Sequence, residues 1–270
     1  MRKTLLLSAL AAGVLGIVAV AYSASKLTLN IASVTPTKAG TLAHPKVERI
    51  RFAYSVTTTD GNRPPPSSDQ LIGFGTGLKV NNRLKATATK FAFAQCKQAQ
   101  ATANACPAST KVGSGIVNNF AGLSSNPSQK IPCKLILTIF NGDSKVFPPA
   151  QNDGRSVRED VWLHLAGSPT TTGCPLVVNA PIPAAWVPFR GGRALSFHIS
   201  KVPFQHPAAG TDNSVISQNT SLFKTARVKG KTRGYFESTA CPKGGRPFVA
   251  ILTDANGGRI TASKKAPCSK

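Results

Sequence analysis

The sequence predicts an all-β fold, an antiparallel β-sandwich of immunoglobulin-like or jelly-roll-like type with one short helix and three disulfides. Three observations lead to this prediction. Apolar and polar residues alternate over many short stretches, which is typical of strands with one buried face. Turn residues recur about every 8 to 12 positions, and no long window has a clear helical period. The chain also contains six cysteines, an even set that indicates disulfides.

The N-terminal segment has the composition of a secretory signal peptide. Two basic residues precede an apolar run from Leu5 to Ala21, and small residues follow it. A basic start, an apolar core and a small-residue cleavage site are the three parts of such a peptide. We therefore expect removal of residues 1–23, with cleavage after Ala21 or Ser23. An uncleaved membrane anchor is the alternative, because the run is close to the shortest that spans a bilayer.

The rest of the chain, residues 24–270, is expected to form one secreted domain made of strands. The strands are expected at residues 27–34, 50–56, 71–80, 90–96, 112–117, 133–140, 161–166, 194–202, 214–228 and 247–254. Residues 97–105 are rich in Ala and Gln and predict one short helix. If the chain instead holds two domains, the loop from Pro148 to Glu159 is the best place for the boundary.

The last predicted strand is followed by a hairpin signal. Asn256-Gly257 is the preferred dipeptide of a two-residue hairpin turn, because both positions need positive φ. The chain is therefore expected to reverse direction there.

The order of these elements suggests how the six cysteines pair. Two of them bracket the expected helix, two meet if strands 133–140 and 161–166 are antiparallel, and two meet at the base of the C-terminal hairpin. Six cysteines allow many other connectivities, and the sequence alone does not select one. These arguments favour the pairs Cys96–Cys106, Cys133–Cys174 and Cys241–Cys268.

The chain is strongly basic because it contains few acids. It has 33 Lys and Arg residues, 10 Asp and Glu residues and a formal net charge of +23. Lys and Arg occur at an ordinary frequency, so the surface must be covered largely by neutral polar side chains. Such a surface attracts polyanions in general, whether cell-wall polymers, anionic lipid or nucleic acid.

Four sets of residues carry a resemblance to known proteins. They are Phe52 to Pro65, Phe93 to Cys96, Cys106-Pro107 with Lys111 to Gly115, and Tyr235 to Cys268. Together they resemble a group of functionally uncharacterised exported proteins of high-GC Gram-positive bacteria, through the order of motifs and cysteines over most of residues 24–270. The resemblance implies a secreted β-sandwich held by disulfides, and it carries no catalytic or binding residue.

The sequence predicts no catalytic residue, no cofactor and no metal site. Gly113-Ser114-Gly115 lacks the spacing of a nucleophile elbow, and Gly73 to Gly77 lacks the Lys-Ser/Thr of a phosphate loop. Asp254 to Gly257 opens like a calcium loop but lacks the later ligands. The adjacent acids Glu159 and Asp160 would point apart on a strand. Four histidines show no metal-ligand spacing, although the last two could meet across a turn: His44, His164, His198 and His206.

One basic segment suggests binding to a polyanion. If the segment is extended, alternate cations face the same way, whereas a turn at Gly230 would place them at a hairpin tip. An alternative is that these cations protect an exposed strand from edge-to-edge pairing. Few aromatic residues lie among them, so stacking on single-stranded nucleic acid is not expected. The residues are Lys224, Arg227, Lys229, Lys231 and Arg233.

These observations favour an exported, non-enzymatic protein of the cell surface or extracellular space. Its basic surface would retain it on anionic cell-wall polymers, with no specific nucleic acid and no membrane span after signal cleavage. The competing hypothesis is a secreted hydrolase acting on polysaccharide or cell-wall material. The shortage of acids argues against a hydrolase, because glycosidases use a pair of carboxyl groups.

Mass spectrometry of the native protein tests export and oxidation together. We expect a mature chain that starts after Ala21 or Ser23 and has no free thiol at any of the six cysteines. A cytosolic protein with an intact leader, or free thiols at these positions, would contradict the prediction.

Overall fold

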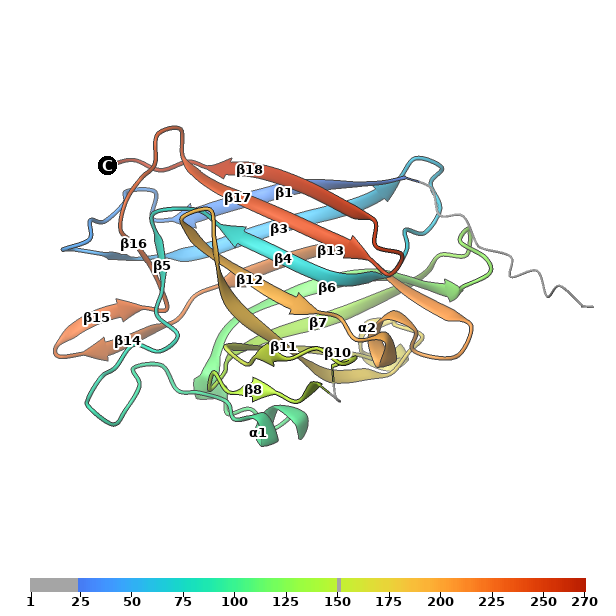
Figure 1. The fold of residues 1–270 in the computed structure, drawn as a ribbon, viewed down its shortest axis with the longest axis horizontal. Coiled ribbons are helices and arrows are strands. Elements are labelled where there is room, and N and C mark those ends of the chain that lie inside the picture. Colours follow the sequence, from blue (N-terminus) through green and yellow to red (C-terminus); the bar gives the residue numbers. More distant parts are fainter. Residues whose placement is uncertain (1–23, 150–151) are drawn as a thin grey trace, which may run out of the picture.

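In the computed structural model, the residues described are 24–149 and 152–270, so the expected signal peptide lies outside them. Within these residues, eleven strands form one large antiparallel sheet (Figure 1). In spatial order the strands are β1 (Ser25–Thr35), β3 (Arg49–Thr58), β13 (Thr211–Leu222), β6 (Lys111–Leu123), β7 (Ile131–Asn141), β10 (Val161–Gly167), β11 (Val178–Phe189), β12 (Gly192–His198), β4 (Ser67–Phe74), β17 (Arg246–Asp254) and β18 (Arg259–Ala266).

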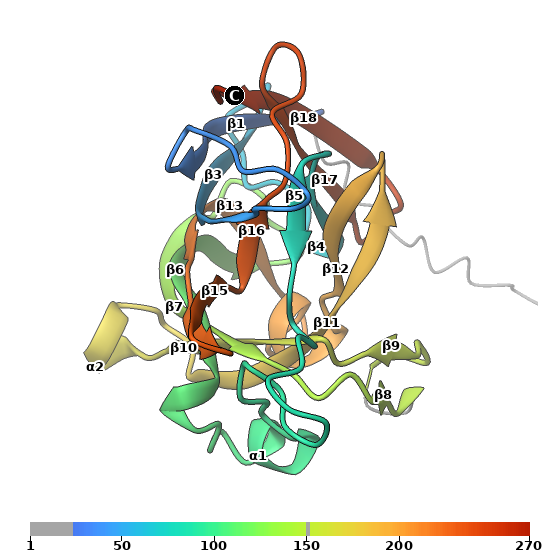
Figure 2. The same cartoon turned by 90° about the vertical axis from the view of Figure 1, so that its left-hand side faces the viewer.

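The two edge strands of this sheet, β1 and β18, lie side by side, so the sheet nearly closes into a barrel. Lys264 in β18 donates a hydrogen bond to the carbonyl oxygen of Asn30 in β1 at 2.5 Å. Figure 2 shows the strands arranged around a common interior. The all-β prediction is confirmed. The sandwich arrangement is not confirmed, because one curved sheet, and not a pair of packed sheets, encloses the core.

Smaller elements surround the ends and one side of the barrel. They are a three-stranded sheet of β2 (Lys46–Val47), β16 (Phe236–Ser238) and β5 (Leu78–Val80), the hairpin β14 (Thr225–Val228) and β15 (Lys231–Gly234), and the pair β8 (Val146–Phe147) and β9 (Val157–Arg158). The helical segments are α1 (Gln98–Thr102), η1 (Ala108–Thr110), α2 (Pro169–Thr172) and η3 (Lys201–Gln205). The predicted helix at 97–105 is confirmed as α1. Among the described residues, each helix is too short to cross a lipid bilayer.

Aromatic rings fill one part of the barrel interior. Phe74 of β4 packs against four rings, with centroid distances between 5.5 and 6.0 Å. These rings belong to four other strands: Phe52 in β3, Trp186 in β11, Phe236 in β16 and Phe248 in β17. Phe74 therefore joins strands that are far apart in the sequence.

Three disulfides are formed, and they are the pairs that the order of elements favoured. Cys96–Cys106 spans α1, Cys133–Cys174 connects the start of β7 to the segment after α2, and Cys241–Cys268 joins the segments that flank β17 and β18. No described cysteine is free. The three disulfides indicate an oxidising environment, such as the extracellular space.

The strands expected at 71–80 and 214–228 are each divided between two elements, β4 with β5 and β13 with β14, and the strand expected at 194–202 ends at His198. Two further predicted features differ in the structure. Residues 90–96 do not form a strand; the amide of the Asn141 side chain holds this segment instead, by donating to the carbonyls of Phe93 and Ala94. The reversal near Asn256-Gly257 is wider than a two-residue turn, because the Asp254 carboxylate accepts hydrogen bonds from the backbone of Asn256 and Gly258. Gly257 alone of the dipeptide has positive φ, at 85°.

Of the strands that were not expected from the sequence, β11 is the longest. β11 contains Pro181, Pro183 and Pro188, and proline lacks the backbone N–H that a central strand donates to its neighbours. β11 is nevertheless paired on both sides, with β10 and β12. Its three prolines are atypical of a central strand, yet β11 lies between β10 and β12 in the large sheet.

Replacing Phe74 with alanine tests the role of the aromatic cluster. Phe74 is 1% exposed, so Phe74→Ala leaves a cavity among four rings and should lower the free energy of unfolding by about 3–5 kcal/mol. Phe223→Ala is the matched control, because Phe223 is 41% exposed and its loss should cost less than about 1 kcal/mol. Guanidinium denaturation of the disulfide-bonded protein measures both. Equal losses would contradict a central role for Phe74.

Candidate functional site

The basic segment predicted to bind polyanions folds into the hairpin β14–β15, which projects from one end of the barrel (Figure 1). Lys229 and Gly230 form its turn with φ values of 48° and 76°, as a two-residue turn requires. Val228 pairs with Lys231, and Arg227 pairs with Thr232. Side chains of paired residues share a face, so Arg227 lies on the opposite face from Lys231. Of the two geometries considered, the structure has the hairpin tip and not the one-sided row.

The cations of this hairpin do not all have the same surroundings. Arg227, Lys229 and Lys231 are exposed, and no described carboxylate lies within ion-pair distance of them. Lys224 is half-buried at the base of the hairpin. Arg233 is already used, because its Nε and Nη2 atoms donate to the two carboxylate oxygens of Glu237 at 2.6 and 2.7 Å. The accessible basic tip therefore consists of Arg227, Lys229 and Lys231.

The Arg233–Glu237 pair fastens the hairpin to β16 of the three-stranded sheet. Glu237 lies in β16 and is buried, and burial by itself would raise its pKa. Hydrogen bonds from Arg233, Asn81 and the backbone of Gly234 outweigh burial, so the pKa of Glu237 is lowered. The hydrogen bond to Glu237 in turn raises the pKa of Arg233. Both side chains are therefore charged at neutral pH, which holds the base of the hairpin in place.

The burial of acids makes the surface more basic than the composition indicates. Five of the ten acids are buried, whereas Arg63 and Arg246 are the buried members of the basic residues within the described chain. The acids that remain at least partly accessible are therefore greatly outnumbered by accessible cations. The buried acids are Glu48, Glu159, Asp160, Asp212 and Glu237.

A second candidate site is a charged cleft of about 690 Å3 at the other end of the barrel. Its acids come from distant parts of the chain and meet because β4, β13 and β17 begin or end there, next to the β8–β9 connection. Three of the five accessible acids and two of the four histidines line it. The lining includes Asp69, Asp153, Asp212, Asp254, His198, His206, Arg155 and Lys201.

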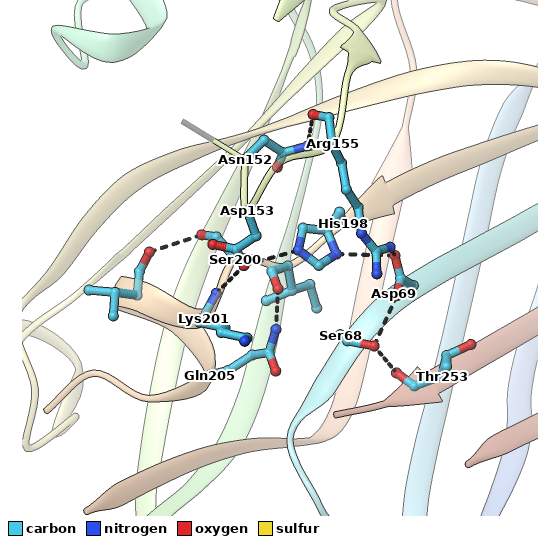
Figure 3. Close-up of polar contacts among 12 residues, drawn as sticks. Ser68, Asp69, Asn152, Asp153, Arg155, His198, Ser200, Lys201, Gln205 and Thr253 are labelled. Carbon is cyan, nitrogen blue, oxygen red and sulfur yellow. Dashed lines mark hydrogen bonds and ion pairs between the residues drawn. The ribbon is translucent and has the colours of Figure 1, made fainter. Parts of the chain in front are cut away.

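His198 occupies the centre of this cleft, between two aspartates (Figure 3). Its Nδ1 atom lies 3.1 Å from Oδ1 of Asp69, and its Nε2 atom lies 3.1 Å from Oδ2 of Asp153. Each ring nitrogen therefore lies within hydrogen-bond distance of a carboxylate oxygen. Arg155 pairs with Asp69 from the outer side. The ring is therefore held by both nitrogens and joins β12 to β4 and to the β8–β9 connection.

The geometry of His198 does not suit a serine hydrolase. A catalytic histidine needs one unprotonated nitrogen that can accept the proton of a serine hydroxyl. Both nitrogens of His198 face carboxylates. The serines in or beside the cleft donate elsewhere: Ser68 to Asp69, Ser124 to Asp212 and Ser200 to the carbonyl of Val202. The charged side chains of the cleft are thus bound to one another.

The carboxyl groups of the cleft also differ from those of a glycosidase. Burial would raise the pKa of Asp153, but the backbone N–H of Lys201 at 2.8 Å and the His198 ring outweigh burial and lower it. A general acid needs a raised pKa. Glu48 and Glu159, whose pKa values burial raises to about 7, lie outside the cleft.

Two other histidines, His206 and His164, have partners of their own. His206 contacts Asp212 at 3.0 Å, so His198 and His206 line one cleft but bind different aspartates. His164 lies 2.7 Å from Asn104, and its pKa is lowered because it is partly buried. Sequence reasoning missed this cleft, because its residues are spread from Asp69 to Asp254 and follow no local motif.

Replacing Glu159 tests the pKa shifts. Burial and the nearby Asp143 raise the pKa of Glu159 from 4.5 to about 7, so the folded protein binds more protons than the unfolded chain in this window. The free energy of unfolding therefore falls as pH rises through it. Glu48 has a similarly raised pKa and contributes in the same window. Glu159→Gln should therefore remove the part of the pH dependence that comes from Glu159, and it should stabilise the protein at about pH 8 by roughly 1–3 kcal/mol.

Glu237→Gln is the matched control with the opposite sign. The lowered pKa of Glu237 stabilises the fold above its ordinary value of 4.5 and loses this effect as pH falls. Glu237→Gln should therefore destabilise the protein at neutral pH. Denaturant titrations between about pH 4 and pH 8 measure both variants. A Glu159→Gln protein whose pH dependence is as steep as that of the unmodified protein would contradict the assignment.

Comparisons with models of known protein families, with curated proteins and with solved structures find no match to this chain. The basic hairpin, the burial of acids and the charged cleft are therefore the features from which a function is inferred.

Proposed function

We propose that this chain is an exported, non-enzymatic protein of the cell surface or extracellular space, and that its basic surface retains it on anionic cell-wall polymers. The observation that supports this most is the distribution of charge. Half of the acids are buried, while nearly all of the described cations remain on the surface. A polyanion approaching this surface meets a positive field with few local interruptions.

The basic tip of β14–β15 is the proposed point of closest contact. Arg227, Lys229 and Lys231 are exposed on a hairpin that projects from the barrel, so a long polymer can reach them from both faces. Arg233 supports the tip through Glu237 and does not itself take part. Three cations at a tip attract a polymer without requiring one fixed alignment of its charges, which suits a polymer of repeated charges.

A hydrolase acting on polysaccharide or cell-wall material is the second candidate. One observation favours it, the collection of accessible carboxylates in the charged cleft. The contacts within the cleft oppose it, because Asp69 and Asp153 both bind His198 and the pKa of Asp153 is lowered. Retention without catalysis therefore fits the geometry better.

Co-sedimentation with purified cell wall over a salt series tests retention. Binding should weaken steeply with salt, because each cation that contacts the polymer contributes about one to the slope of log affinity against log salt. In the triple variant Arg227→Gln, Lys229→Gln, Lys231→Gln, the magnitude of this slope should be smaller by up to about three.

The triple variant Lys26→Gln, Lys134→Gln, Arg259→Gln is the control. It removes the same charge from exposed positions on β1, β7 and β18 and should change the slope less. Equal losses in the two variants would contradict the hairpin as the contact. Salt-independent binding with release of soluble sugar would favour the hydrolase.

A further inference from the structure

A second basic projection lies beside the hairpin β14–β15. It consists of residues 82–92, between β5 and α1, which we call the basic loop. The basic loop and the hairpin leave the barrel at the same end and lie next to each other in both views (Figures 1 and 2). The loop has no acid and three exposed cations, Arg83, Lys85 and Lys90. No described carboxylate lies within ion-pair distance of them.

Both ends of the basic loop are fixed to the base of the hairpin. At its start, the side-chain amide of Asn81 donates to the carbonyl of Gly234 at 2.8 Å, and the backbone N–H of Asn81 donates to the carbonyl of Tyr235 at 2.8 Å. At its end, the ring of Phe93 packs edge-on against the ring of Tyr235, with centroids 5.4 Å apart. Gly234 is the last residue of β15. The two projections therefore start from one small, buried area.

The basic loop is held in a narrow turn of its own. Lys85 pairs with Phe91 in an antiparallel bridge, and the backbone N–H of Ala86 donates to the carbonyl of Lys90 at 2.9 Å. The ammonium of Lys85 lies 3.9 Å from the centroid of the Phe91 ring, and the guanidinium carbon of Arg83 lies 5.8 Å from it. A cation over an aromatic face is attracted by the ring. The loop thus presents its cations at defined positions on the surface.

The two projections form one area of positive charge. Two acids lie at their base, and both are buried and bonded: Glu237 to Arg233, and Asp160 to Arg158 and Asn82. Neither acid offsets the charge at the tips, so an approaching anion meets a positive field from both sides. Each projection contributes three exposed cations to this area. They are Arg83, Lys85, Lys90, Arg227, Lys229 and Lys231.

We propose that the basic loop and the basic tip of the hairpin bind one linear polyanion together, so that a single polymer chain contacts both projections. The inference rests on the proposed function and adds a requirement on the partner, which must be long enough to reach from one projection to the other. When two contacts are made by one chain, the second contact is intramolecular and the affinity exceeds that of either contact alone. A short anion contacts only one projection. The surface therefore selects a long chain over the same anionic group in short pieces.

Inorganic polyphosphate of two lengths tests this selection in the disulfide-bonded protein. Tripolyphosphate is the short probe, and a chain of about 60 phosphates is the long one. The measured quantity is the length gain, which is the affinity per phosphate for the long chain divided by that for tripolyphosphate. Isothermal titration calorimetry at one salt concentration supplies both affinities. The variant Arg83→Gln, Lys85→Gln, Lys90→Gln should have a length gain at least about tenfold smaller than the unmodified protein.

Three further variants separate a shared contact from general attraction. The triple variant of Arg227, Lys229 and Lys231 should lose as much of the length gain as the basic-loop variant, and replacing all six cations should lose no more. Losses that multiply in the sixfold variant would mean two independent contacts and would overturn the proposal. The charge-preserving variant Arg83→Lys, Lys85→Arg, Lys90→Arg should keep the length gain. The earlier control at Lys26, Lys134 and Arg259, which removes three charges elsewhere, should also keep it.

Amide NMR of the unmodified protein tests the same point without any substitution. The amide signals of Lys90 and Lys229 should shift together as the long chain is added. Shifts confined to one projection would overturn the proposal, as would a folded basic-loop variant with an unchanged length gain. Either result, combined with salt-dependent retention on cell wall, would leave the proposed function standing. Loss of that retention with a preserved length gain would instead contradict the proposed function alone.

Discussion

Packing of rings around Phe74 links strands that the sequence places far apart. Phe52, Trp186, Phe236 and Phe248 reach it from β3, β11, β16 and β17, and all are buried. The curved sheet brings four of these rings together, with Phe236 added from β16, and its first and last strands are neighbours. The barrel ends, the basic hairpin and the charged cleft are all placed by this closure. A flat sheet of the same strands would leave the rings in water and the cleft unformed.

Closure also explains the surface charge. Glu48 and Arg246 lie together in the interior, and burial raises the pKa of Glu48 to about 7 despite the nearby guanidinium. Glu237 is buried with Arg233 at the base of the hairpin. Acids that are buried in ion pairs no longer offset the positive charge of the exposed lysines and arginines. The internal ion pairs and the basic exterior are therefore two results of one arrangement, and the exterior is what a polyanion would meet.

The sequence was informative where structure depends on neighbours along the chain. Alternating residues located β1 and β3, and runs of strand-forming residues located β7 and β17. The spacing of cysteines agreed with all three disulfides. It failed where distant residues decide the outcome. β11 is a central strand despite three prolines, and Asn141 holds residues 90–96 outside the sheet. The cleft around His198 had no sequence signal, since Asp69 and Asp153 reach His198 from different elements.

The sequence by itself determined the strand-rich class, the shortage of acids and the basic segment, because each depends on composition or on short spacings. It favoured the three cysteine pairs, and the tertiary structure decided them. Only the tertiary structure decided that the sheet closes as a barrel and that half of the acids are inside it. It also decided that Arg233 is bound to Glu237 while Lys229 and Lys231 are exposed. The physical reason is that curvature, burial and ion pairing depend on contacts between strands, and a one-dimensional pattern does not specify which strands meet.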